Sequence, residues 1–136
     1  MEKLALDQVK VLLNRAAEKV AGEYQRPACI SICDENGFLL GFHRMDGGPV
    51  RSIQISQSKA YTAIRMGVST DAFLERLRKD NVDIKYFCDP LLTALPGGSL
   101  LKGKNGRIVG AAGVSGLAPS EDQAITNDLA DLISTW

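Results

Sequence analysis

The chain has 136 residues, of which 45% are hydrophobic and 24% are charged, and its 16 basic and 16 acidic side chains cancel to a formal net charge of zero. This length and composition are typical of one globular domain, residues 1–136, with its own hydrophobic core. A neutral chain lacks the field that attracts nucleic acids and anionic membranes, so we expect neither as a partner.

The lack of a recognisable targeting signal and the pattern of cysteines both favour a cytoplasmic location. The sequence shows no signal-peptide core and no apolar run long enough to span a bilayer. Its three cysteines, Cys29, Cys33 and Cys88, are an odd number that cannot pair completely within one chain. Cys29 and Cys33 lie outside the Cys-x-x-Cys spacing and there is one histidine, so we expect no metal site. We predict a cytoplasmic protein with reduced, mostly buried thiols.

The first half of the chain predicts a helix, a hairpin and a second helix. Apolar residues recur at helical spacing over 3–24. Segments 28–34 and 38–45 have the pattern of strands and flank Asn36-Gly37, a strong turn signal, which predicts an antiparallel hairpin. A glycine-proline break follows, and residues 51–66 then predict a helix.

The second half predicts another hairpin between two helices, because Asn105-Gly106 is a second hairpin signal. Two hairpins can join in one antiparallel sheet covered by helices, an α+β architecture. The expected elements are a helix over 71–79 with Thr70 as N-cap, an irregular stretch over 81–95, strands over 100–104 and 107–115, and a last helix opened by a capping box at Ser120.

Three segments carry residue types that suit anion binding. Arg44 and Asp46 end the first hairpin beside two glycines, and Lys59 lies in the middle of the next predicted helix. If that helix packs back across the strand ends, we expect the three side chains to converge on a concave, net positive site. For each segment the structural alternative is open: a strand-end salt bridge with a turn, or a solvated lysine.

The third segment is rich in glycine. Seven of the 13 glycines lie between Gly97 and Gly116, in a stretch that includes Gly98 and Ser115. Glycine permits positive φ and exposes backbone N–H donors, although turns and close packing would also explain some of these positions. Hydrolase signals are weak, since there is no Gly-x-Ser-x-Gly elbow and nothing local supports a dyad of His43 with Ser115 or Cys33.

Taken together, the order of these segments resembles the GlcG/HbpS-like family, which includes the C-terminal domain of PduO-type proteins. The resemblance covers nearly the whole chain. It rests on residues 41–47 (Gly-Phe-His-Arg-Met-Asp-Gly), 58–63 (Ser-Lys-Ala-Tyr-Thr-Ala), 96–98 (Pro-Gly-Gly), 105–116 (Asn-Gly-Arg-Ile-Val-Gly-Ala-Ala-Gly-Val-Ser-Gly) and Glu121-Asp122.

The resemblance implies a profilin-like fold, in which helices pack on the faces of a central antiparallel sheet. It implies homo-oligomers, from dimers up to octamers. It also implies haem as a candidate cofactor, because several relatives bind haem and haem degradation has been attributed to some. For other relatives the resemblance implies an association with glycolate, diol or glycerol metabolism and with cobalamin handling, without a settled activity.

We therefore expect an oligomeric protein that binds haem or another small anionic ligand in an accessory metabolic role. Two alternatives remain open. One is an enzyme that acts on a small carboxylate or degrades haem, with Lys59, Asp46 or His43 in the chemistry. The other is a structural assembly subunit without a ligand. The predicted ligand-binding residues are His43, Arg44, Asp46, Lys59, Gly97, Gly98 and Ser115.

Overall fold

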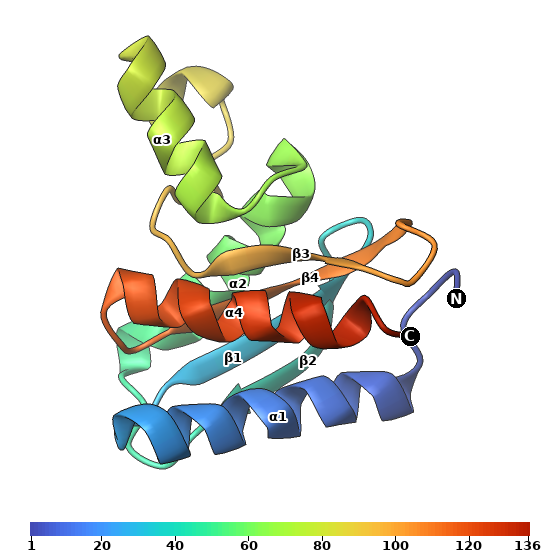
Figure 1. Ribbon diagram of the computed structural model, residues 1–136. Coiled ribbons are helices and arrows are strands. Elements are labelled where there is room, and N and C mark those ends of the chain that lie inside the picture. The colour runs from blue at the N-terminus through green and yellow to red at the C-terminus, as the bar shows by residue number, and fades with distance from the viewer.

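The computed structural model describes residues 1–136 and contains one sheet of four strands with helices on both faces (Figure 1). All strand pairs are antiparallel, in the order β2-β1-β4-β3, which confirms the predicted α+β class. No helix combines the length and apolar character needed to cross a membrane. The elements are α1 (Leu6–Tyr24), β1 (Cys29–Asp34), β2 (Leu39–Arg44), α2 (Val50–Met66), α3 (Thr70–Asp80), the 3-10 helix η1 (Ile84–Phe87), β3 (Gly98–Lys102), β4 (Ile108–Ser115) and α4 (Pro119–Ile133).

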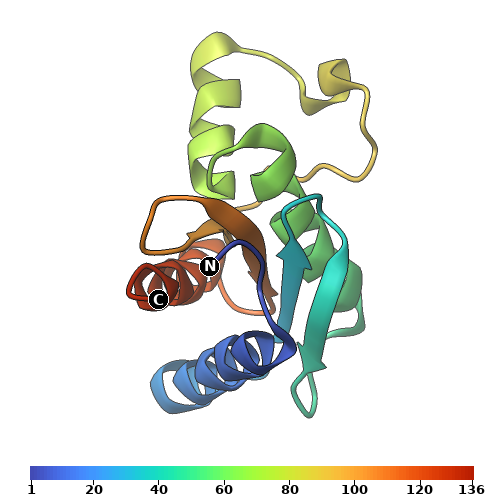
Figure 2. The same cartoon turned by 90° about the vertical axis from the view of Figure 1, so that its right-hand side faces the viewer.

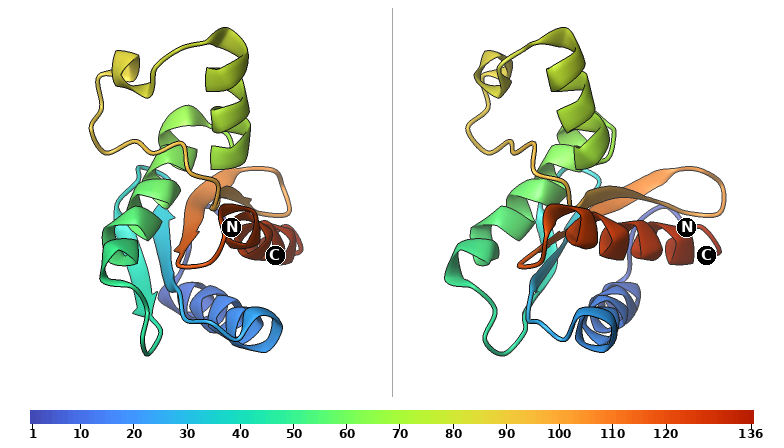
Figure 3. Two further views of the ribbon diagram at one scale, coloured as in Figure 1. Left: turned by 90° about the vertical axis from the view of Figure 1, so that its left-hand side faces the viewer. Right: turned by 60° about the vertical axis from the view of Figure 1, so that its left-hand side comes forward.

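The helices form two layers around the sheet. Helices α1 and α4 cover one face, and α2 covers the other (Figures 1 and 2). Helix α3 and the segment with η1 project beyond the sheet from the end of α2 (Figure 3). Strand β2 is one edge of the sheet, and its outer side has no neighbouring strand.

The two faces of the sheet are packed differently. Beneath α1 and α4, sixteen buried side chains form an aliphatic core that includes Leu12, Ile30 and Leu129. Beneath α2, the buried cluster consists of small residues such as Ala60 and Ala111, and buried serines lie beside it. Small side chains let the α2 backbone come close to the sheet.

Gly113 shows how close this approach is. A Cβ atom added to Gly113 would overlap the carbonyl oxygen of Ser56 and lie 2.7 Å from the backbone nitrogen of Ala60. Gly110 faces the other side, where an added Cβ would lie 3.1 Å from the Leu4 side chain. The glycines of β4 therefore serve close packing of the sheet against its neighbours.

Two helix starts differ from the sequence-based expectation. Helix α4 begins at Pro119, one residue before the predicted capping box at Ser120, because proline suits the first position of a helix. Glu121 Oε1 instead accepts a hydrogen bond from the backbone nitrogen of Ala118. Ser69, not Thr70, is the N-cap of α3. Cys29 and Cys33 are free and buried as predicted, whereas Cys88 is exposed.

Candidate functional site

Lys59 lies inside the protein and is not a free cation. Its side chain is 2% exposed, and Nζ donates to the Val114 carbonyl oxygen at 2.8 Å and to Asp122 Oδ2 at 3.1 Å. The other carboxylate oxygen, Asp122 Oδ1, accepts from the backbone nitrogen of Leu117 at 3.1 Å. The ion pair thus ties α2 to the end of β4 and the first turn of α4.

Burial dominates the electrostatics of this pair. Desolvation lowers the pKa of Lys59, and attraction to Asp122 works against that change. Desolvation likewise raises the pKa of Asp122, opposed by the Lys59 charge and by the Leu117 hydrogen bond. For each group the desolvation penalty outweighs the attraction to the partner charge, as is common for buried ion pairs.

The Gly97-Gly98 turn is saturated by internal hydrogen bonds. The Gly97 nitrogen donates to Gln123 Oε1 at 2.7 Å, and the Gly98 nitrogen donates to Thr70 Oγ1 at 2.9 Å. Gly97 has a φ of +131°, and an added Cβ would lie 2.7 Å from Lys59 Nζ, so glycine is required there. These N–H groups have no capacity left for an anion.

None of the remaining predicted residues forms a hydrogen bond or an ion pair with Lys59, whose partners are Val114 and Asp122. Ser115 is buried and donates to Ser52 Oγ at 3.0 Å. Arg44 is exposed and its Nε donates to the Gly48 carbonyl oxygen at 2.9 Å. Asp46 is exposed in a turn beside the end of α1, in a shallow depression shared with Arg26.

His43 belongs to the opposite face of the sheet. It pairs with Ile30, which faces the core beneath α1. Gly41, two residues earlier and therefore on the same face, lies against Val9 and Leu13 of α1. Ser56 and Lys59, by contrast, come from α2 on the other face.

The predicted convergence of Arg44, Asp46 and Lys59 is therefore wrong. Lys59 meets the Gly97-Gly98 turn as expected, but its charge is neutralised by Asp122, and the resulting cluster is enclosed. The sequence pattern could not show this, because Asp122 lies 63 residues further along the chain. Ligand contacts of the predicted residues stay a prediction, and a net positive pocket containing Lys59 is excluded by the geometry.

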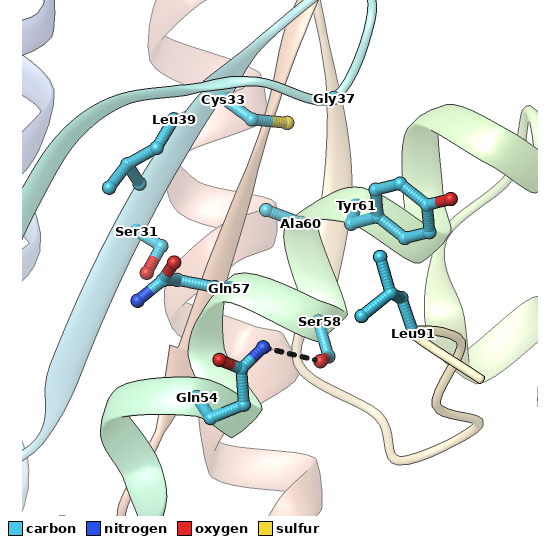
Figure 4. A pocket seen from close by; sticks show the side chains of 10 residues that line it. All are labelled: Ser31, Cys33, Gly37, Leu39, Gln54, Gln57, Ser58, Ala60, Tyr61 and Leu91. Carbon is cyan, nitrogen blue, oxygen red and sulfur yellow. Dashed lines mark hydrogen bonds between the residues drawn. The ribbon is translucent and has the colours of Figure 1, made fainter.

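A cavity lies on the α2 face, between α2 and the β1–β2 hairpin (Figure 4). Its volume is about 130 Å³. Buried residues form its floor, and half-buried or exposed residues form its rim. The lining consists of Ser31, Cys33, Gly37, Leu39, Gln54, Gln57, Ser58, Ala60, Tyr61 and Leu91.

The wall beside Leu91 is held by two hydrogen bonds to α2. Tyr61 Oη donates to Asp89 Oδ2 at 2.5 Å, and the Thr93 nitrogen donates to Thr62 Oγ1 at 3.0 Å. These bonds fix the segment 89–93 on either side of Leu91, and Figure 4 shows Leu91 next to the Tyr61 ring. The cavity is therefore closed on this side by a segment distant in sequence.

The lining mixes polar and apolar residues in equal number and carries no charged side chain. Burial raises the pKa of Cys33 to about 12, so this thiol is neutral at physiological pH. The hydrogen bond to Asp89 raises the pKa of Tyr61, so the phenol also stays protonated. Hydroxyl, amide and thiol groups beside two leucines are suited to binding a ligand, and none is activated as a nucleophile.

The cavity residues were not among those predicted from the sequence. Gln54, Gln57, Ser58 and Tyr61 do recur at helical spacing on one face of α2. That stripe is the one available signal, and it is the same pattern that a solvated helix face shows. The contribution of Leu91 has no local signal, because the path of residues 81–97 depends on tertiary contacts.

The fold is that of a small α+β protein with a cavity beside an open sheet edge. Residues 4–131 match the model of the family described as haem degrading protein HbpS-like. The chain belongs to this HbpS-like family, as the sequence resemblance indicated.

Similar proteins agree with this assignment. An uncharacterised 15.0 kDa protein from the dhaT-dhaS intergenic region of Citrobacter freundii is 32% identical over 121 residues, covering 88% of this chain and 85% of the relative. The structure of the Klebsiella pneumoniae protein ORFY matches with a TM-score of 0.87 at 25% identity, and the match covers 100% of this chain and 94% of ORFY. The PduOC:heme complex has a TM-score of 0.85 at 24% identity, with 96% of this chain and 95% of that one covered, which shows the shared fold.

Proposed function

We propose that this protein is a self-associating, small-ligand-binding member of the HbpS-like family, with haem as its first candidate ligand. The observation that carries the binding function is the preformed cavity, whose neutral polar groups converge between α2 and the β1–β2 hairpin. Concave sites with a few converging polar groups are the usual form of small-molecule sites. The family description and the haem complex of a protein with this fold support haem.

The cavity of one chain does not fit a whole haem. Its volume of about 130 Å³ lies below the roughly 300–1,000 Å³ of pockets that enclose ligands of that size. It also lacks an imidazole, because His43 is on the opposite face, and the Cys33 thiol stays protonated. No residue of the cavity is therefore assigned as an iron ligand.

The surface around the mouth of the cavity is apolar and could contact the flat face of a porphyrin. Leu39 and Leu91 line the mouth and are each 51% exposed. Leu39 begins β2, whose outer edge is unpaired, and such edges are available for pairing with another chain. We place haem against this apolar rim, in an assembly in which a second copy of the chain covers it. This assembly is part of the proposal.

A haemin titration followed by absorbance tests the proposal. We expect a saturable shift of the Soret band for the wild-type protein and for a Leu6→Ser control, which removes an even more exposed leucine (65%) from α1. The double variant Leu39→Ser/Leu91→Ser should weaken binding at least tenfold. Equal binding by the rim variant, or no shift for the wild type, would contradict the proposed site.

The family description also supports a second candidate, an enzyme that degrades haem. Lys59 is unsuited to direct contact with a substrate because it is enclosed and paired with Asp122. Incubating the haem-loaded protein with a reductant and oxygen separates the two functions. Binding alone leaves the Soret band in place, whereas degradation removes it over several turnovers. An accessory role in glycolate, diol, glycerol or cobalamin metabolism also remains a proposal.

A further inference from the structure

The cavity between α2 and the β1–β2 hairpin is too small for haem but large enough for a molecule of a few non-hydrogen atoms. Its volume of about 130 Å³ has room for several water molecules. Ser31, Cys33 and Ala60 form its floor and are almost fully buried. A molecule that reached the floor would contact these buried side chains on one side, while its other side would face the open mouth of the cavity.

Hydrogen-bonding groups with spare capacity face this space from α2. Gln57 Nε2 donates to the Ile53 carbonyl oxygen at 3.2 Å, which leaves Gln57 Oε1 without a partner in the chain. Ser58 Oγ accepts from Gln54 Nε2 at 3.2 Å, and its own hydroxyl hydrogen remains available. Figure 4 shows these side chains around the opening. One acceptor and one donor therefore lie one residue apart on the same helix.

The charge of the lining selects against ions. No lysine, arginine, histidine, aspartate or glutamate lines the cavity, and Lys59 is turned away toward Asp122. An ionised ligand would lose part of its hydration on entering the cavity without gaining a counter-charge, which is unfavourable. A neutral molecule that carries hydroxyl or carbonyl groups would exchange its water hydrogen bonds for those of the glutamine and serine side chains.

Leu39 and Leu91 add an apolar clamp on the two sides of the opening. The hydrogen bonds of Asp89 and Thr93 to α2 hold Leu91 in place before a ligand arrives. A ligand with a short carbon chain would contact these leucines while its oxygens reach Gln57 and Ser58. The site is thus preorganised for a ligand whose carbon chain contacts the leucines and whose hydroxyl groups face Gln57 and Ser58.

We infer that this cavity binds a small neutral polyol or hydroxy-carbonyl compound of a few carbons. The inference deepens the proposed ligand-binding function by naming a ligand class for the cavity itself, distinct from haem on its rim. It differs from the anionic ligand expected from the sequence, because the cation on which that expectation depended is neutralised by Asp122.

Ligand-observed saturation-transfer NMR on the full chain tests the inference, with glycerol as the probe and glycerate as its charged counterpart. We expect saturable glycerol binding in the millimolar range, as about six non-hydrogen atoms allow, and at least tenfold weaker binding of glycerate. Gln57→Leu should weaken glycerol binding about three- to tenfold through loss of the acceptor, and Ser58→Ala should act similarly. Gln8→Leu, on α1, is the matched control and should bind as the wild type does.

Equal or tighter binding of glycerate, an unchanged affinity in both cavity variants, or no saturable glycerol signal would overturn the inference. A thermal melt of each variant checks that the fold is kept, and two different substitutions guard against one that disturbs it. A haemin titration on the same samples separates this inference from the proposed function. Haem binding without glycerol binding would refute the polyol site alone, and glycerol binding without haem would refute the rim site alone.

Discussion

Replacing Lys59 should destabilise the fold, because the substitution leaves the buried carboxylate of Asp122 without a counter-charge. In Lys59→Met, Asp122 would lose its only counter-charge while keeping one hydrogen bond, from the Leu117 nitrogen. The Val114 carbonyl oxygen would also lose the donor that Lys59 provides. Removing one partner of a buried ion pair costs about 3–5 kcal/mol, and for a chain of this size about 10–20 °C in Tm.

The double variant Lys59→Met/Asp122→Asn removes both charges but keeps an acceptor for Leu117. Because desolvation outweighs attraction for each partner, we expect the double variant to recover most of the stability lost by Lys59→Met. Urea unfolding followed by circular dichroism gives the free energies for this double-mutant cycle. A loss of less than about 1 kcal/mol for Lys59→Met, or a double variant that loses as much stability as the two single variants combined, would contradict this prediction.

Two further predictions follow from close packing and burial. Gly113→Ala should lower stability by about 1–3 kcal/mol through overlap with the α2 backbone, while Gly22→Ala, in open space on α1, should be neutral or stabilising; comparable melting temperatures for the two variants would contradict the packing argument. We expect one fast-reacting thiol per chain, Cys88, with a disulfide reagent between pH 7 and 9. Burial raises the pKa values of Cys29 and Cys33 and keeps both as unreactive thiols. Rapid modification of two or three cysteines would show that the sheet face is open.

Local sequence signals were sufficient for the elements of the fold. The two Asn-Gly turns are where the sequence indicated them, and each joins two antiparallel strands of the single sheet. The apolar periodicity of 3–24 and 51–66 predicted α1 and α2 to within three residues at each end. These features are determined by neighbours in the chain, so a pattern of a few residues carries the information.

The candidate site depended on contacts that local patterns do not contain. Lys59 was predicted to face a ligand, but its partner is Asp122 on the last helix. Gly97 and Gly98 were predicted as free donors, but the Gly97 nitrogen donates to Gln123 and the Gly98 nitrogen donates to Thr70. The same residue types serve an internal polar cluster and a ligand site equally well, so tertiary structure alone could distinguish the two.

Native mass spectrometry of the protein, before and after incubation with haemin, tests the central claim of a self-associating ligand-binding protein most directly. We expect assemblies at multiples of the 14.7 kDa chain mass that gain the mass of haem in whole-number steps. A species at the mass of one chain that gains no haem at any ratio would contradict it.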